Sequence, residues 1–369
     1  MFLRYEQNNN FMRDVRFKLG FLLAILLIVN FLPVTGNAIE VTIDFEYLSD
    51  IATGGAPFDV QIKGDTAFVS DYNGGLSAFD ISNASDPSLL DNLPLIRAHY
   101  FHVVGDFAFI ACWDYGLQII NITDPTNLIA IGNYDDGTNV GGTFVSNDIA
   151  LVTKTDGGVL ILNVSNPTQP ERISQFNDTG IPNVVTVWDD VAFVVYWKED
   201  GSRVLFLDIS DPAAPTLIGQ YTDIADTYDI HVRDDLLIIA NDLMGVFFVN
   251  ISNLANSEKI TEYDTGGLSL GVDTIDNYLF VGDSHTIEVI DFSDFSKLRN
   301  VGSYDDTEQS QKLQIVDDLV FVCNNPKGLV ILQYTIEELT STSIILILFP
   351  TFAGFAILTF LIIYSKKKK

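Results

Sequence analysis

The sequence predicts an all-β fold made of seven repeated units, and three observations lead to this prediction. An apolar run that ends in Asp, Asn or Gln and continues with an apolar residue and Ser or Thr recurs seven times. The steps between its Asp, Asn or Gln positions are 41, 42, 45, 42, 41 and 42 residues. Each unit also holds four short apolar or alternating runs separated by turn residues. This period, with four strands per unit, is typical of a β-propeller, so we expect seven four-stranded blades.

The repeated motif marks the third strand of each unit. Its copies are Leu76–Ser82, Leu117–Thr123, Val159–Ser165, Val204–Ser210, Val246–Ser252, Ile287–Ser293 and the degenerate Leu329–Thr335. In the fifth unit the predicted strands are Asp229–Arg233, Leu236–Ala240, Val246–Ile251 and Ile260–Tyr263. Asn121, Asn163 and Asn250 form glycosylation sequons where other units carry Asp, and capping of the following turn explains them without a sugar.

The seventh unit stops after its third strand, and the start of the chain supplies the missing one. An aromatic residue ends most fourth strands, as at Tyr134 and Tyr263. The segment Val41–Tyr47 has the same pattern and the same final aromatic. We expect this N-terminal strand to close the last blade, which removes exposed strand edges from the ring.

These repeats resemble the LVIVD-repeat β-propellers, a family named for the run seen here in variants such as Val204–Asp208 and Ile287–Asp291. The resemblance covers residues 41–335. Members of this family are typically secreted or anchored at the cell surface, and their partners are mostly unassigned. The resemblance therefore implies a fold and a location and adds little about chemistry.

The first 38 residues have the features of a secretory signal. A basic stretch ending at Lys18 precedes the apolar run Leu19–Phe31, and small residues follow up to Ala38. We interpret residues 1–38 as a signal peptide cleaved near Ala38. The alternative is an uncleaved signal anchor, because the stretch before the apolar run is long.

The chain ends with a second apolar segment. Residues 344–364 contain no charge and would span roughly 31 Å as a helix, which matches the core of a bilayer. The basic tail 365–369 indicates a cytoplasmic end by the positive-inside rule. We therefore expect residues 39–335 to form an extracellular propeller. A short stalk, 336–343, and a single transmembrane helix would hold it at the plasma membrane.

The charge balance limits the partners. The chain has 20 Lys and Arg against 49 Asp and Glu, for a formal net charge of -29, so we expect no nucleic-acid partner. Its two cysteines, Cys112 and Cys323, fall in second strands of non-adjacent blades, and we expect buried free thiols. None of the four histidines belongs to a recognisable metal-binding motif, which disfavours a transition-metal site.

One rim of the propeller carries the residues predicted to bind. The loops that lead into the first strands share this rim with the turns between second and third strands, and we call it the first-strand rim. The stalk leaves from the opposite rim, so the first-strand rim should face away from the membrane. Loops on a rigid scaffold commonly carry binding residues. The candidates in the second and fourth blades are His99, Tyr100, His102, Trp113, Asp114, Tyr115, Tyr196 and Trp197, and the fifth blade adds Asp229 and His231 at the entry to the channel.

Exposed Trp and Tyr are favoured contact residues, and we therefore predict binding of a surface protein or a glycan. The alternative for each aromatic is that it plugs the rim or packs between blades. Aligned by their turns, the first strands place two sets of residues along the channel. One set is Gln61, His102, Phe144, Thr186, His231, Asp273 and Gln314. The other, two residues earlier, is Asp59, Tyr100, Gly142, Val184, Asp229, Gly271 and Lys312.

Two other functions remain open. An extracellular hydrolase or lyase would use Asp229 and His231 as an acid–base pair, and it would need a third group converging with them in a concave pocket. The simpler interpretation is that these polar residues solvate a water-filled channel. A structural component of the cell envelope would instead make its contacts through the sides of the blades.

Calcium is the one cofactor for which the sequence offers candidate ligands. Hard oxygen ligands cluster on loops of the first-strand rim, as calcium requires, although neither cluster has EF-hand spacing. Acidic turns also occur throughout the chain, and we otherwise expect no cofactor. The candidates are Asp135, Asp136, Asn139, Asp305 and Asp306.

Overall fold

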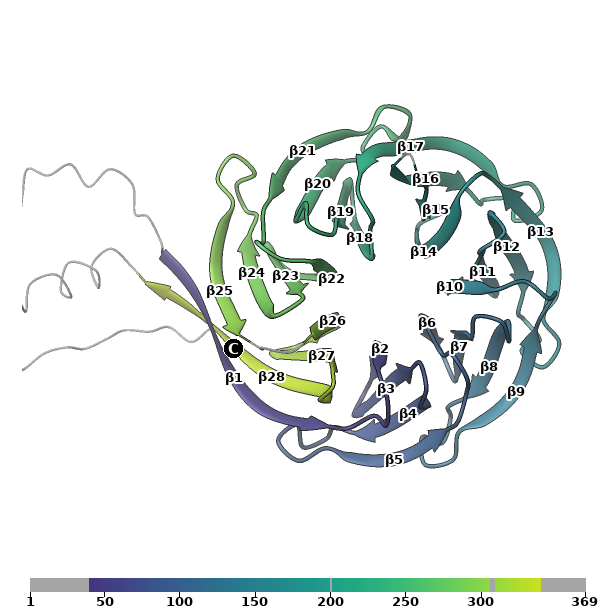
Figure 1. The fold of residues 1–369 in the computed structure, drawn as a ribbon, viewed down its shortest axis with the longest axis horizontal. Coiled ribbons are helices and arrows are strands. Elements are labelled where there is room, and N and C mark those ends of the chain that lie inside the picture. The colour runs from purple at the N-terminus through teal and green to yellow at the C-terminus, as the bar shows by residue number, and fades with distance from the viewer. Residues whose placement is uncertain (1–39, 200, 306–308, 340–369) are drawn as a thin grey trace, which may run out of the picture. The chain divides into compact units, whose positions relative to one another are not determined.

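The computed structural model describes residues 40–199, 201–305 and 309–339, and residues 42–336 form one compact unit. In this unit seven antiparallel sheets of four strands each are arranged in a ring around a common centre (Figure 1). The predicted all-β, seven-bladed propeller is therefore confirmed. The one helical element among the described residues is the short 3-10 turn η1, Leu254–Asn256.

Six blades are meanders whose first strand lies at the centre of the ring and whose fourth strand lies at the outside, and in the seventh the outer strand comes from the start of the chain (Figure 1). The first strands are β2 (Pro57–Lys63), β6 (Phe101–Val104), β10 (Val140–Ser146), β14 (Ile181–Trp188), β18 (Asp229–Arg233), β22 (Ser269–Ile275) and β26 (Gln309–Val316). The second strands are β3 (Thr66–Asp71), β7 (Phe107–Ala111), β11 (Ile149–Lys154), β15 (Val191–Trp197), β19 (Leu236–Ala240), β23 (Tyr278–Asp283) and β27 (Leu319–Asn325).

The repeated motif forms the third strand of every blade, as predicted. The third strands are β4 (Gly75–Asp80), β8 (Leu117–Asn121), β12 (Gly158–Asn163), β16 (Ser202–Asp208), β20 (Val246–Asn250), β24 (Thr286–Asp291) and β28 (Gly328–Leu339). The fourth strands are β5 (Ser88–Leu93), β9 (Ile129–Tyr134), β13 (Glu171–Asn177), β17 (Thr216–Ile224), β21 (Glu258–Tyr263), β25 (Arg299–Asp305) and β1 (Glu40–Ile51).

The start and the end of the chain share the last blade. Its strand order is β1-β28-β27-β26, so β1 pairs with β28 and supplies the outer strand, as predicted (Figure 1). Strand β28 extends to Leu339. Residues 336–339, which were predicted to belong to the stalk, therefore continue this strand.

The polar residue of the repeated motif caps the turn that follows it. Its side-chain oxygen accepts a hydrogen bond from the backbone N–H two residues later, at 2.9 Å in each of six blades. Asp and Asn both provide this oxygen, which explains why they alternate at the position. The pairs are Asp80–Ser82, Asn121–Thr123, Asn163–Ser165, Asp208–Ser210, Asn250–Ser252 and Asp291–Ser293.

The hydrophobic core lies between neighbouring blades. Between the fourth and fifth blades it contains Phe193, Phe206 and Phe247, each at most 2% exposed. Cys112 and Cys323 are buried free thiols, as expected. Burial raises the pKa of Cys112 to about 12, so it stays protonated and unreactive at neutral pH.

Several predictions lie outside the described residues. They are the signal peptide at 1–38, the transmembrane helix at 344–364 and the basic tail at 365–369. Within the part of the chain that the structure describes, no helix has the length and apolar character needed to cross a bilayer.

Candidate functional site

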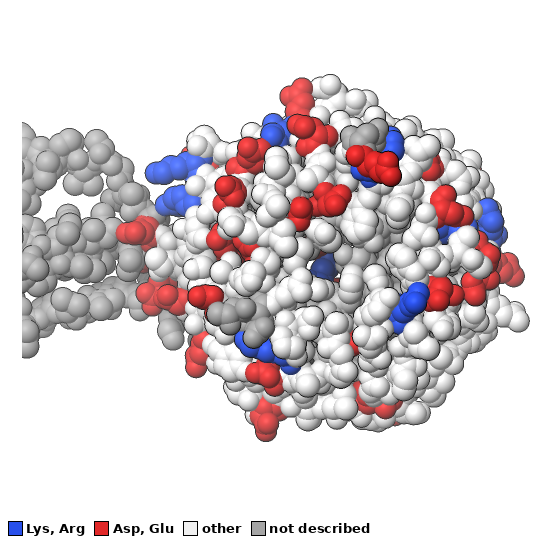
Figure 2. All heavy atoms as spheres, viewed as in Figure 1, with Lys and Arg blue, Asp and Glu red and all other residues white. Residues whose placement is uncertain are grey.

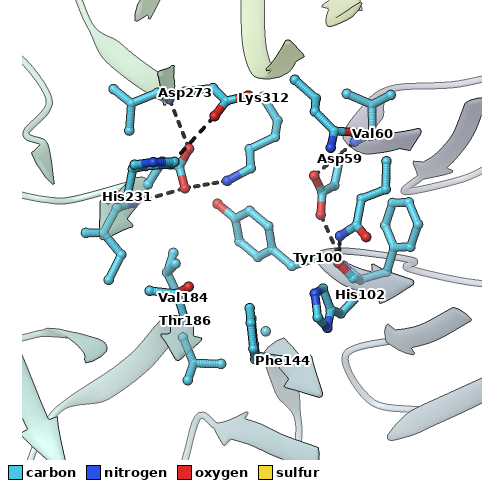
Figure 3. Close-up of a pocket in the computed structure, with 18 of the residues that line it drawn as sticks. Asp59, Val60, Tyr100, His102, Phe144, Val184, Thr186, His231, Asp273 and Lys312 are labelled. Carbon is cyan, nitrogen blue, oxygen red and sulfur yellow. Dashed lines mark hydrogen bonds and ion pairs between the residues drawn. The ribbon is translucent and has the colours of Figure 1, made fainter. Parts of the chain in front are cut away.

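The first strands enclose a cavity of about 300 Å³ in the centre of the ring (Figure 3). Every residue of the two predicted channel sets lines it, except Gly271. The alignment of turns in the sequence therefore located the walls of this cavity correctly. Figure 2 shows one face of the propeller, with acidic side chains spread over it and a basic side chain at the floor of the central hollow.

A buried ion pair crosses part of this cavity. The ammonium group of Lys312, on β26, forms a salt bridge and hydrogen bond with the carboxylate of Asp229, on β18. Burial opposes the charge of Lys312, but Asp229 and Asp59 together outweigh it, and the pKa of Lys312 is raised. Burial also raises the pKa of Asp59 to about 6, although Lys312 counteracts part of this effect. One lysine thus faces several carboxylates, of which that of Asp229 is almost completely buried.

Polar side chains of the first strands also connect consecutive blades. Each accepts a hydrogen bond from a backbone N–H on the first strand of the next blade, at 2.7–3.2 Å. The innermost strand has no further strand beside it, so its free N–H groups need such acceptors. The pairs are Asp59–Phe101, Gln61–Val103, His102–Val145, Asp229–Val272, Asp273–Ile315 and Gln314–Ile62.

The two channel histidines are neutral near pH 7. Burial lowers the pKa of His102 to about 4, and its Nδ1 accepts from Val145, so the proton lies on Nε2. The His102 ring stacks on Phe144 with centroids 4.1 Å apart. Burial also lowers the pKa of His231, outweighing the attraction of Asp273, whose Oδ1 lies 3.6 Å from His231 Nδ1.

Tyr100 spans the channel. It precedes β6 in the second blade, and its hydroxyl donates to the carbonyl of Tyr228, in the fifth blade, at 2.8 Å. Lys312 Nζ lies 5.9 Å from the centroid of the Tyr100 ring. The central position of Tyr100 is evident in Figure 3. From the sequence, a rim aromatic could either contact a partner or plug the rim, and Tyr100 fits the second interpretation.

The other candidates in the second blade form a packed group with a partly exposed edge. The His99 ring lies 4.2 Å from Phe58 and 5.6 Å from Trp113, measured between centroids. Burial lowers the pKa of His99 to about 4. Asp114 forms an ion pair with an arginine at 3.4 Å, and Tyr115 is 45% exposed. Tyr115 is thus the aromatic of this group that is most available to a partner.

The candidates in the fourth blade lie mainly inside the protein. Tyr196 is fully buried and belongs to β15, so the expectation that it forms an exposed contact is wrong. Side chains alternate along a strand, and this one faces the core between blades. Trp197 is partly buried and its Nε1 donates to the carbonyl of Thr227 at 2.9 Å. Both residues connect blades.

The first-strand rim also carries exposed apolar residues that the sequence analysis did not single out. Leu243 and Met244, in the turn between β19 and β20, are 70% and 54% exposed. Ile96, before β6, is 60% exposed, and Ile181, at the start of β14, is 46% exposed. Their turn positions were readable from the repeat. The sequence did not show whether these side chains are exposed, because apolar residues in short turns also pack inward in many proteins.

In the first of the two predicted calcium clusters, both aspartates are engaged by other groups. Asp136 forms an ion pair with Lys154 at 2.8 Å, and Asp135 caps its own turn through the N–H of Gly137. Asp305 ends a strand in another blade, and Asp306 lies outside the described residues. The described ranges contain no group of three His, Cys, Asp or Glu that could hold a metal ion.

Fold and site together define a repeat β-propeller with a polar central cavity, across which Tyr100 reaches, and a rim on which a few apolar side chains are exposed. The LVIVD repeat matches residues 54–93, 98–136, 139–178, 184–223 and 266–306, more than half of the chain. The protein therefore belongs to the LVIVD-repeat family. The fifth and seventh blades fall outside these matches, yet they have the same four strands.

Solved structures with the same fold are distant in sequence. The β-propeller domain of Cps50 (Swd1) from Myceliophteria thermophila has 10% identity and a TM-score of 0.63, covering 79% of this chain and 99% of that domain. The computationally designed Ika8 protein has 10% identity and a TM-score of 0.60, covering 78% and 99%. No curated protein matches the chain. At this identity the similarity concerns the fold alone.

Proposed function

We propose that this protein is an interaction module that binds a protein or glycan partner through its first-strand rim. The exposed apolar side chains on that rim carry the proposal. Leu243, Ile96 and Met244 are each more than half exposed, and Ile181 and Tyr115 add further apolar surface. Leu243 and Met244 are neighbours in one turn, and adjacent exposed apolar side chains of this kind are typical of a contact site. At the opposite ends of the strands the exposed apolar side chains lie in the strands themselves rather than in turns, namely Val104, Trp188, Leu89, Ile129, Leu217 and Ile260.

The channel residues support binding over catalysis. Asp229 bonds Lys312 and two backbone N–H groups, and its side chain is 1% exposed. His231 Nε2 lies 3.1 Å from the hydroxyl of Thr274 and its Nδ1 faces Asp273. The acid–base pair of a hydrolase or lyase would have to break these contacts before it could act. We therefore retain no separate catalytic proposal.

In this proposal the propeller is displayed outside the cell. The support comes from residues 1–38, which have the pattern of a secretory signal, and from the apolar run at 344–364 with its basic tail. Protease added to intact cells should remove a tag placed in an exposed propeller turn and spare a tag after Lys369. Protection of the propeller tag would contradict surface display.

The rim is tested by photo-crosslinking on cells that produce the full chain. The rim variant Leu243→Ser/Met244→Ser should lose a specific crosslinked partner. The matched control is Leu89→Ser/Ile129→Ser on the outer strands, where these side chains are 54% and 46% exposed. The control should keep the partner. Loss in the control alone would move the interface to the blade sides and favour a structural role in the envelope. Absence of any specific partner with the unaltered protein would contradict the proposal.

A further inference from the structure

The central cavity has more acidic than basic groups. Three carboxylates, those of Asp59, Asp229 and Asp273, line it, against the single ammonium group of Lys312. Burial raises the pKa of Asp273 as well as that of Asp59, as expected where carboxylates lack sufficient positive charge. His231 does not supply that charge at neutral pH, because burial lowers its pKa. The net charge of -29 reinforces this field.

The cavity also has an apolar side and access to solvent. Phe144 and Val184 lie along one side of it, and His231 and Lys312 lie along the other (Figure 3). The ring of Phe144 is held in place by stacking on a histidine at 4.1 Å. The side chains of His231 and Lys312 are 29% and 24% exposed, so the cavity is open to water. Its volume of about 300 Å³ accommodates a small molecule or one side chain.

We propose that this cavity binds an organic cation, an ammonium group attached to an apolar or aromatic body. Each oxygen of Asp59 and Asp273 accepts one backbone N–H and keeps a further lone pair, beside which the ammonium group adds positive charge. The apolar body lies along Phe144. An aromatic body gains offset stacking with that ring. The cation belongs either to a free amine or to a lysine side chain of a bound partner. This proposal does not depend on binding at the rim.

The first test compares three probes of equal size by isothermal titration with the full chain in detergent, at about pH 8 and constant ionic strength. Benzylamine carries the ammonium group, benzyl alcohol is its neutral counterpart, and benzoate is an anion. We expect saturable binding of benzylamine, at least about tenfold tighter than that of benzyl alcohol, and none of benzoate. Equal affinity for the amine and the alcohol, or no saturable binding of the amine, would overturn the proposal.

The second test uses pH. Six titratable groups face the same cavity as Asp59, namely Tyr100, His102, Asp229, His231, Asp273 and Lys312. Burial raises the pKa of Asp59 to about 6, so below that pH its charge is lost and a cation is held less tightly. Benzylamine affinity should therefore fall about tenfold between about pH 8 and pH 5. Protonation of Asp273 acts in the same direction. Affinity that is unchanged or rises over this range contradicts the proposal.

A pair of variants separates the cavity from the general surface charge. Asp59→Asn removes a carboxylate that lines the cavity, whereas Asp234→Asn removes one whose side chain is 82% exposed. Benzylamine should bind Asp59→Asn several-fold more weakly and bind Asp234→Asn unchanged. Equal effects of the two variants would show general attraction to an acidic protein and sink the proposal. If Asp59→Asn fails to fold, the pH series with the unaltered chain decides.

The two sources of the cation are told apart by competition. If the cation is a side chain of the rim partner, benzylamine should reduce crosslinking of that partner. If it is a free amine, crosslinking should persist in saturating benzylamine. The probe titrations use the isolated protein, so their outcome does not depend on whether a partner binds the rim. Likewise, the crosslinking experiment can identify a rim partner whether or not the cavity binds benzylamine.

Discussion

Replacing Lys312 by methionine tests whether one ammonium group stabilises the acidic channel. Methionine keeps most of the volume of lysine but has no charge, so the substitution removes the salt bridge to Asp229. The Asp229 side chain is 1% exposed and that of Lys312 24% exposed. Removing one partner of a fully buried pair costs about 3–5 kcal/mol, because the other charge stays buried without compensation. Lys312 is partly exposed and water reaches its cavity, so we expect Lys312→Met to lower the free energy of unfolding by less, about 2–3 kcal/mol.

The cost of this substitution should depend on pH. Burial raises the pKa of Asp59 from 3.8 to about 6, and Lys312 opposes that rise. Without Lys312 the pKa of Asp59 rises further. A carboxyl group whose pKa is raised on folding contributes stability that is present below its unfolded pKa and lost as the pH rises through its folded pKa. The difference between the unaltered chain and Lys312→Met should therefore be largest above about pH 7 and smallest near pH 4.

Urea unfolding of the full chain in detergent, followed by tryptophan fluorescence, measures these differences. The matched control is Lys63→Met, because Lys63 lies 3.2 Å from Asp106 but their side chains are 41% and 59% exposed. Such a surface pair contributes about 0–1 kcal/mol. The double variant Lys312→Met/Asp229→Asn should recover part of the lost stability. A cost no larger than that of the control, or no recovery in the double variant, would refute the electrostatic explanation.

Three further predictions follow from local contacts, each measured by urea unfolding. Burial lowers the pKa of His102 from 6.5 to about 4, so the stability it contributes is lost as the pH falls through this range. The advantage of the unaltered chain over His102→Gln should shrink by about 3 kcal/mol between about pH 7 and pH 4; a constant difference would contradict this. A Cβ on Gly219 would clash with the carbonyl oxygen of Leu254 in η1, so Gly219→Ala should lower the free energy of unfolding by about 1–3 kcal/mol. An unchanged free energy of unfolding would show that η1 can move away without cost. Asn121→Ala removes a turn cap and should cost about 1 kcal/mol, whereas Asn121→Asp keeps the acceptor and should cost less.

The fold was predictable because each of its features repeats. The Asp or Asn of the third strand recurs at a nearly constant step, and its turn-capping bond recurs with it. Closure of the ring was readable because Val41–Tyr47 has the pattern of a fourth strand in the place where one is missing. Local patterns of this kind depend on nearby residues, so the sequence alone reveals them.

The site was only partly predictable because its contacts join residues far apart in the chain. Aligning the turns of the repeat identified the residues that line the channel. In the sequence analysis, Asp229 and His231 were nevertheless treated as side chains that are free to act on a ligand. Their partners, Val272 and Thr274, lie on the next blade and become neighbours only when the ring closes. Tyr196 was misplaced for the related reason that the end of β15, and hence the direction of its side chain, was uncertain from sequence.

The channel itself separates structural from functional positions. Connecting two blades needs only an acceptor for a backbone N–H, and Asp, Gln and His all fill that role here. Such positions can exchange residues without loss of the ring. Tyr100 and Lys312 differ, because each appears once and makes a contact that skips blades. Tyr100 and Lys312 thus depart from the repeat at its centre, where they determine the charge and the packing of the cavity. Because Lys312 also compensates the buried carboxylate of Asp229, variation at this position should change the charge of the cavity and the stability of the propeller together.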